Sequence, residues 1–111
     1  MELRAEERGG ALVVHVLQDR IDAASAIRFK DRMRDVTQDS LPRVVLDLSQ
    51  VAFLDSSGLG AVVAVRKALG PDRVLELSGL TPTVQKVFRL TRMDTIFHIH
   101  DSLSDGLRDA G

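Results

Sequence analysis

The sequence has 111 residues, with 15 basic and 16 acidic side chains and a formal net charge of −1. This length accommodates one domain with one modest hydrophobic core, and the balanced charge argues against a nucleic-acid or anionic membrane partner. The absence of cysteine, tryptophan and tyrosine excludes disulfides, thiolate chemistry and the side chains that most often stack on bases or sugars. No apolar run is long enough to span a bilayer, and the acidic N-terminus is unlike a signal peptide. We therefore expect a cytoplasmic protein with one domain over residues 1–111.

The N-terminal pattern predicts a β-hairpin. Residues 2–6 read as a short edge strand, and the sequence Glu7-Arg8-Gly9-Gly10 is a turn signal. Residues 11–17 are apolar at almost every position, which is typical of a strand covered on both faces.

A first helix is expected after this hairpin. Asp22 is a good helix cap, so the helix is predicted to begin at Ala23-Ala24. One buried stripe follows from spacings of three and four residues; it is formed by Ala26, Phe29, Met33 and Val36.

Strands and helices then alternate to the end of the chain. Strands are predicted over residues 43–48, 74–78 and 95–100, and helices over residues 57–69, after Pro82 and after Ser102. Thr81 is the expected cap of the helix that begins at Pro82, and its core positions are Val84, Val87, Phe88 and Leu90. This order predicts an α/β fold with a mixed, partly parallel β-sheet, an N-terminal hairpin and about four helices.

The stretch from Leu54 to Gly60 joins a strand to a helix and contains two serines. Asp55 is the predicted helix cap, and the backbone NH groups that follow it have no partner inside the helix. A negative group is favourable at that helix end. The sequence therefore places the hydroxyls of Ser56 and Ser57 at an exposed turn that tolerates an anion.

One face of the predicted helix 57–69 carries only small side chains. An ordinary exposed face would carry lysine, glutamate and glutamine. The small side chains indicate a docking surface for a partner, unless alanine serves here only as a helix former or another part of the domain covers the face. With the motif glycine, the expected partner-binding residues are Gly58, Gly60, Ala61, Ala64 and Ala68.

Enzymatic and metal chemistry find little support in these residues. Neither serine lies in a Gly-x-Ser-x-Gly elbow, and no lysine follows the glycines as a phosphate-binding loop would need. His98 and His100 share one face of a strand, but a metal needs a third ligand and only His15 remains among the histidines. No metal and no cofactor are expected.

With these chemistries set aside, the serine pair in the stretch from Leu54 to Gly60 indicates phosphorylation of a serine by another protein. A phosphate adds roughly −1.5 to −2 charges and is tolerated at a helix N-terminus, so folding would survive it. A partner docked on the small-residue face would instead meet a dianion beside Asp55. Phosphorylation would therefore switch the binding of the partner and not the folding of the domain.

The string from Asp55 to Gly60, with the strand 44–48 before it and Arg20-Ile21-Asp22 upstream, resembles the STAS domain of bacterial anti-sigma factor antagonists. This resemblance implies a protein that, unphosphorylated, binds an anti-sigma factor serine kinase and releases a sigma factor. It implies that the kinase phosphorylates Ser56 and that a serine phosphatase resets the switch. By position, Asp22, Asp55 and Ser57 match the residues that flank the phosphorylation site of the family. Asp19 stands where the family commonly has glycine.

Two other functions are open. A STAS subunit of a lipid-transport or stressosome complex would dock through the same surface without a phosphorylation switch. An enzyme that acts through Ser56 would need a base, and none is visible in the sequence.

Overall fold

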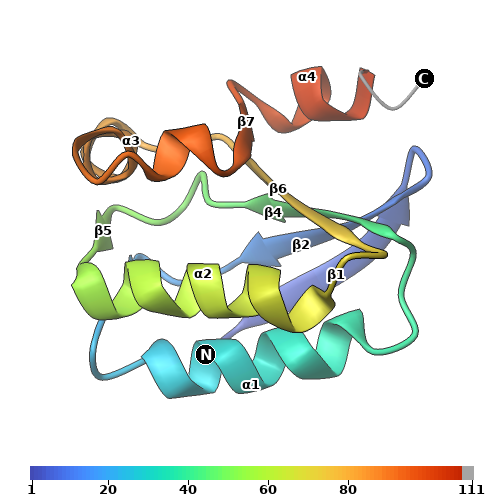
Figure 1. Ribbon diagram of the computed structural model, residues 1–111, viewed down its shortest axis with the longest axis horizontal. Coiled ribbons are helices and arrows are strands. Elements are labelled where there is room, and N and C mark those ends of the chain that lie inside the picture. Colours follow the sequence, from blue (N-terminus) through green and yellow to red (C-terminus); the bar gives the residue numbers. More distant parts are fainter. Residues whose placement is uncertain (109–111) are drawn as a thin grey trace.

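A computed structural model describes residues 1–108 of the chain (Figure 1). It contains seven strands, four α-helices and one short 3-10 helix among these residues. Their bounds are β1 (Leu3–Arg8), β2 (Ala11–Val16), β3 (Arg20–Ile21), α1 (Ala26–Thr37), β4 (Arg43–Asp47), β5 (Phe53–Leu54), α2 (Ser56–Leu69), β6 (Val74–Ser78), α3 (Pro82–Leu90), the 3-10 helix Met93–Thr95, β7 (His98–His100) and α4 (Leu103–Arg108).

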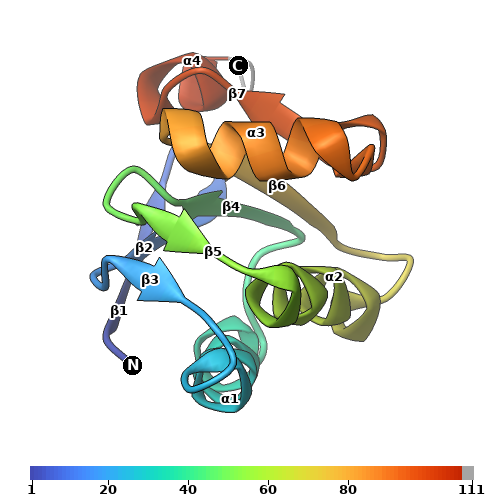
Figure 2. The ribbon, with the colours of Figure 1, turned by 90° about the vertical axis from the view of Figure 1, so that its left-hand side faces the viewer.

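The main sheet has five strands in the order β1-β2-β4-β6-β7. β1 pairs with β2 antiparallel, and the other neighbours are parallel, which confirms the predicted mixed sheet and N-terminal hairpin. Gly9 and Gly10 both have positive φ angles, +57° and +78°, as a tight two-residue hairpin turn requires. β3 and β5 form a separate parallel pair beside the start of α2 (Figure 2).

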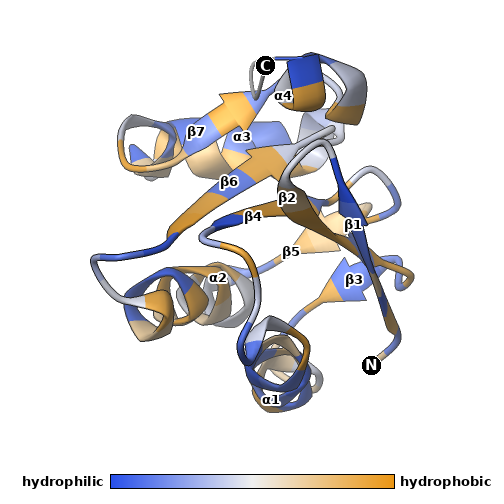
Figure 3. Cartoon of the chain, turned by 90° about the vertical axis from the view of Figure 1, so that its right-hand side faces the viewer, coloured by the Kyte–Doolittle hydropathy of each residue, from blue (hydrophilic) through white to orange (hydrophobic). Residues whose placement is uncertain are grey.

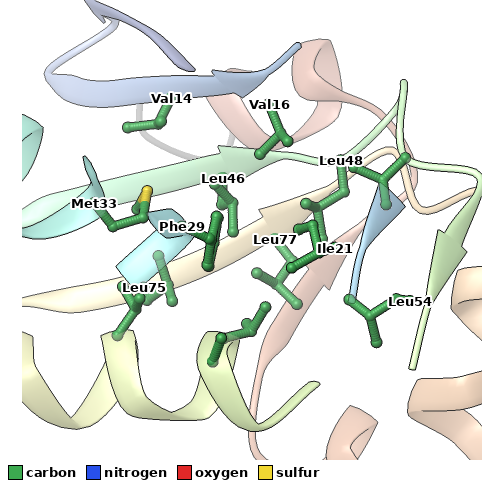
Figure 4. Close-up of a cluster of buried hydrophobic side chains, with 14 of the residues drawn as sticks. Val14, Val16, Ile21, Phe29, Met33, Leu46, Leu48, Leu54, Leu75 and Leu77 are labelled. Atoms are coloured by element: carbon green, nitrogen blue, oxygen red, sulfur yellow. The ribbon is translucent and has the colours of Figure 1, made fainter. Parts of the chain in front are cut away.

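The hydrophobic core lies between the main sheet and helices α1 and α2, which run side by side (Figure 1). Alternate residues of the central strands point into it, and Phe29 and Met33 of α1 close it from the helix side (Figure 4). α3 adds Val84 and Phe88, and the Phe88 ring meets Phe97 edge to face at a centroid distance of 5.8 Å. The predicted inward stripe of the first helix is thereby confirmed, with Val36 only partly buried.

The opposite face of the sheet carries buried polar side chains. His15 lies between Asp47 and Glu6, with its ring nitrogens 2.7 and 2.6 Å from their carboxylate oxygens. Figure 3 shows hydrophilic and hydrophobic residues together along β1. The run 11–16 is buried throughout, so the prediction of a strand covered on both faces is confirmed.

Three local predictions were wrong. The first helix begins at Ala26, because Asp22 holds residues 23–25 in a turn instead of capping the helix. Leu90 is 72 % exposed, since it falls in the last turn of α3 beyond the core. The last strand spans only His98–His100, because residues 93–95 form a 3-10 turn.

Other expected helix ends are confirmed in part. Thr81 precedes α3 with Pro82 in its first turn, but its hydroxyl donates to the backbone oxygen of Val51 at 2.7 Å and does not cap the helix. The hydroxyl of Ser102 accepts a hydrogen bond from the NH of Asp105 at 3.1 Å, as predicted for the cap of α4.

None of the helices within residues 1–108 has the length and apolar character needed to cross a membrane.

Candidate functional site

Asp55 holds the start of α2 and ties it to the turn before α1. Its carboxylate accepts a hydrogen bond from the NH of Gly58 at 2.9 Å, so the predicted helix cap is confirmed. The second carboxylate oxygen accepts from the NH of Ala23 at 3.2 Å. One side chain therefore fixes two loops that are 32 residues apart in the chain.

The first turn of α2 packs directly against β3. A Cβ atom added at Gly58 would lie 2.1 Å from the backbone oxygen of Ile21, a distance that no side chain tolerates. β3 is itself held by β5, with Ile21 paired with Leu54 and Arg20 with Phe53. Only glycine fits at position 58, and the close packing sets the position of the two serines just before it.

Asp22 organises the loop on the other side of the site. Its carboxylate accepts hydrogen bonds from the NH groups of Ala24 and Ser25, at 3.1 and 3.2 Å, and from Arg20 Nε at 2.9 Å. Desolvation raises the pKa of Asp22, but the hydrogen bonds from Arg20 and Ser25 outweigh it and hold that pKa below its usual value. The carboxylate therefore stays ionised and keeps the turn closed.

Asp19 adopts its turn conformation without a positive φ angle. The only non-glycine residues with positive φ within residues 1–108 are Asp39 and Arg92. The backbone oxygen of Asp19 accepts hydrogen bonds from the NH groups of Ala52 and Phe53, at 2.7 and 3.1 Å. This backbone oxygen thus links the segments that lead into β3 and β5.

Ser56 and Ser57 occupy the first two positions of α2, and both are exposed. Neither hydroxyl has a hydrogen-bond partner within the part of the chain that the structure describes. The N-terminal end of α2 carries the partial positive charge of the helix dipole. Both hydroxyls are therefore accessible to a macromolecule that approaches this end of the helix.

The small-residue face of α2 is divided between the interior and the surface. Gly58 and Ala61 were expected to bind a partner, but both are buried, since they lie on the side of the helix that packs on the domain. Gly60 and Ala68 are exposed, and Ala64 is half-buried. The exposed strip therefore comprises Gly60, Ala64 and Ala68, which follow one another at intervals of four residues.

A shallow groove runs between this strip and α1. Ala64 and Ala68 line one side, and Ile27, Lys30 and Arg34 line the other. Part of the small-residue face is thus covered by another helix of the same domain, an alternative that the sequence left open. The groove remains open to solvent and has an apolar floor with charged sides.

The sequence pattern did not identify three exposed side chains beside the site. Phe53 is 41 % exposed next to the serines, and the Arg20 guanidinium lies 4.8 Å from the centre of its ring. Ile27 is 68 % exposed on the first turn of α1. The exposure of Phe53 follows from its place in β5, a two-residue strand that no periodicity reveals.

The histidines lie outside this site. His15 is in β2, where it contacts Glu6 and Asp47, whereas His98 and His100 are in β7. Within the described residues, no histidine hydrogen-bonds to Ser56 or Ser57. The three histidines also do not form one metal site.

The site therefore defines a class of protein: a small α/β domain with an accessible serine pair at the start of a capped helix. The chain belongs to the STAS domain family, whose sequence profile matches residues 2–106. The predicted family and fold are thereby confirmed.

Relatives with this fold include regulators of sigma factors. The chain is 24 % identical over 82 residues to the anti-sigma-B factor antagonist of Staphylococcus aureus, covering 73 % of this chain and 76 % of that protein. It is similar to an anti-sigma factor antagonist from Mycobacterium paratuberculosis, with a TM-score of 0.87, 30 % identity and coverage of 98 % and 92 % of the two chains. The phosphorylated form of the Bacillus cell fate determinant SpoIIAA has the same fold at 16 % identity, with a TM-score of 0.70 and coverage of 99 % and 100 %.

Proposed function

We propose that this chain is an anti-sigma factor antagonist that acts by partner switching. In its unphosphorylated form it binds an anti-sigma factor serine kinase and thereby releases a sigma factor. Phosphorylation of Ser56 blocks that binding, and a serine phosphatase restores it. The observation that carries the proposal is the exposed Ser56 hydroxyl at the first position of α2, at one end of the exposed strip Gly60, Ala64 and Ala68.

The local structure tolerates a phosphate on Ser56. The Asp55 cap holds the first turn of α2, and Gly58 packs it against β3, so the turn does not depend on the serine hydroxyl. The positive end of the helix dipole favours the added negative charge. Phosphorylation is therefore expected to leave the fold intact.

The phosphate is expected to change the binding of the partner and not the folding of the domain. It adds roughly −1.5 to −2 charges next to Asp55 and Asp22. A partner docked over the α2 strip would have to desolvate this dianion or place a cation against it. Arg20, the nearby cation that the structure shows, already pairs with Asp22 at 2.9 Å. The expected result is loss of binding.

Apolar side chains around the serines support protein docking. Phe53 is exposed on β5, just before the serines. Ile27 is exposed on α1, beside Ala64 and Ala68. The strip on α2 lets the backbone of a partner approach closely, because it carries no long side chain. Aromatic and aliphatic anchors beside a smooth surface are typical of protein interfaces.

A phosphorylation assay tests the modification. The purified chain is incubated with ATP and the anti-sigma factor serine kinase encoded beside its gene, and the products are resolved by phosphate-affinity electrophoresis. We expect one shifted band from the wild type, the same band from Ser57→Ala and none from Ser56→Ala.

Two results would contradict the proposal. Transfer of phosphate to Ser57 in place of Ser56 would move the switch to the other hydroxyl. Stable binding of the kinase without any transfer would favour the alternative in which this domain is a permanent subunit of a larger complex.

A further inference from the structure

Two histidines and a glutamate meet on the polar face of the sheet, away from the serine site. His98 and His100 lie two residues apart in β7, so their side chains share one face of the strand. Glu76 of the neighbouring strand β6 is paired in register with His98. One ligand atom from each of these three side chains lies within 4.8 Å of the other two.

We propose that Glu76, His98 and His100 form a binding site for a divalent transition-metal ion of the zinc type. Two imidazoles and one carboxylate are a donor set that zinc uses in sites with a fourth, solvent-filled position. Imidazole donors select such ions over calcium and magnesium, which prefer oxygen ligands. The sequence indicated no third ligand near this histidine pair and led us to expect no metal. His15 lies on β2, which two strands separate from β7, whereas Glu76 on the neighbouring strand β6 supplies the third ligand.

The carboxylate of Glu76 is fixed for this role by a second set of contacts. Arg43 Nε lies 2.6 Å from Glu76 Oε2, and Arg43 Nη2 lies 2.8 Å from Oε1. Together with the contact to His100 Nε2, these two hydrogen bonds hold the Glu76 carboxylate in one orientation. Ligating carboxylates in metal sites are commonly held by such hydrogen bonds.

The buried part of the site is also preformed. His100 Nε2 lies 2.6 Å from Glu76 Oε1, and the ring is buried beneath α4, where Gly106 leaves room for it. A tetrahedral zinc ion with bonds of about 2.0–2.1 Å separates its ligand atoms by roughly 3.3 Å. Binding therefore requires a small outward shift of the ring, and the ion takes the place of the direct contact between His100 Nε2 and Glu76 Oε1.

The other side of the site is open to the ion. His98 is exposed, and its ring centre lies 4.2 Å from that of His100. It borders a surface hollow at the edge of the sheet, which Ile96 and Glu76 also line. An ion can enter from this side, and His98 can rotate onto it without disturbing the core. The ion would then join the edge strand β7 to β6.

The test uses the full-length chain freed of any affinity tag and of bound metal. Zinc chloride is titrated into it by isothermal titration calorimetry, and thermal unfolding is followed with and without zinc. We expect one zinc ion per chain and a higher melting temperature in its presence. His98→Ala, which removes an exposed ligand, is expected to weaken binding about 10-fold or more and to abolish the thermal shift.

Asp101→Asn is the matched control, because Asp101 is an exposed carboxylate next to β7 that lies outside the cluster. It should bind zinc as the wild type does. Calcium chloride should neither bind nor raise the melting temperature. The proposal is overturned if the wild type does not bind zinc, if His98→Ala binds as tightly, or if Asp101→Asn loses as much affinity as His98→Ala. Circular dichroism verifies that each variant is folded.

Discussion

The backbone oxygen of Ile21 occupies the space that a side chain at Gly58 would need, with a separation of only 2.1 Å from an ideal Cβ. This contact seats the first turn of α2 on β3 and fixes the direction in which the helix leaves the sheet. Neither backbone segment can yield easily, because β3 is paired with β5 and the helix is capped by Asp55.

Gly58→Ala is therefore expected to destabilise the protein strongly, by about 2–3 kcal/mol, as overpacking of a rigid site does. Gly60→Ala is the matched control, since nothing lies within 4 Å of a Cβ there and the residue is exposed in the helix interior. It should stabilise the protein by about 0.5–1 kcal/mol. Urea unfolding of the two variants measures both effects, and equal destabilisation by both would show that the Ile21 contact is unimportant.

Asp55→Ala removes the helix cap and the link to Ala23 together. We expect a loss of about 1–2 kcal/mol in the free energy of unfolding, because caps alone contribute about 1 kcal/mol. Ser57→Ala serves as the control; its hydroxyl has no hydrogen bond within residues 1–108, and its effect should stay within about 0.5 kcal/mol. A comparable loss from both variants in denaturant unfolding would contradict the role assigned to Asp55.

The ionised Asp47 carboxylate is expected to contribute to the free energy of unfolding at neutral pH, and this contribution should be lost in acid. Desolvation raises its pKa, but hydrogen bonds from Ser49 and contact with His15 outweigh that effect and hold the pKa below its usual value. The folded state therefore binds this proton less readily than the unfolded state. The stabilisation is complete above the unfolded pKa of about 4 and is lost as the pH falls through the lower folded pKa.

Asp47→Asn should thus lower the melting temperature at pH 7 and have a smaller effect at pH values below about 3. Asp72→Asn, an exposed carboxylate in the loop after α2, should change little at either pH. Thermal unfolding by circular dichroism across this range measures the difference. A deficit in Asp47→Asn that does not shrink in acid would contradict the assignment.

If the strip on α2 contacts the partner, a substitution in it should weaken partner binding even when the chain is not phosphorylated. Ala68→Arg places a long, charged side chain on the exposed part of the strip. We expect at least about 10-fold weaker binding of the anti-sigma factor kinase, or 1.4 kcal/mol, with stability unchanged within about 0.5 kcal/mol. Gln85→Arg, at an exposed position on α3, should bind as the wild type does in the same calorimetric titration. Normal binding by Ala68→Arg would exclude this part of α2 from the interface.

Much of this architecture was predictable from the sequence, because its local signals agree with its tertiary contacts. The apolar runs at residues 11–16 and 43–47 predicted buried strands, and Asp55, as a helix cap, predicted the start of α2. The serine pair could be placed at an exposed helix end for the same reason. Glycine pairs and capping residues indicate turns and helix starts from the local sequence alone, because their effect on the backbone does not depend on distant contacts.

The remaining features depend on contacts between distant segments. The small-residue pattern of α2 does not show that Ala61 faces the core or that α1 flanks Ala64, since both facts depend on how the helices pack. The pairing of Glu76 with His98 depends on strand register, which the histidine spacing does not reveal. Asp22 was assigned to a helix cap because a turn and a cap use the same carboxylate hydrogen bonds.

The most direct test of the partner-switching proposal compares two forms of this chain against one kinase. The chain phosphorylated on Ser56 is purified, and its affinity for the anti-sigma factor kinase is measured by calorimetry beside that of the unmodified chain. We predict at least about 10-fold weaker binding by the phosphorylated form, equivalent to 1.4 kcal/mol, with unchanged circular dichroism. Equal affinities of the two forms would contradict the switch.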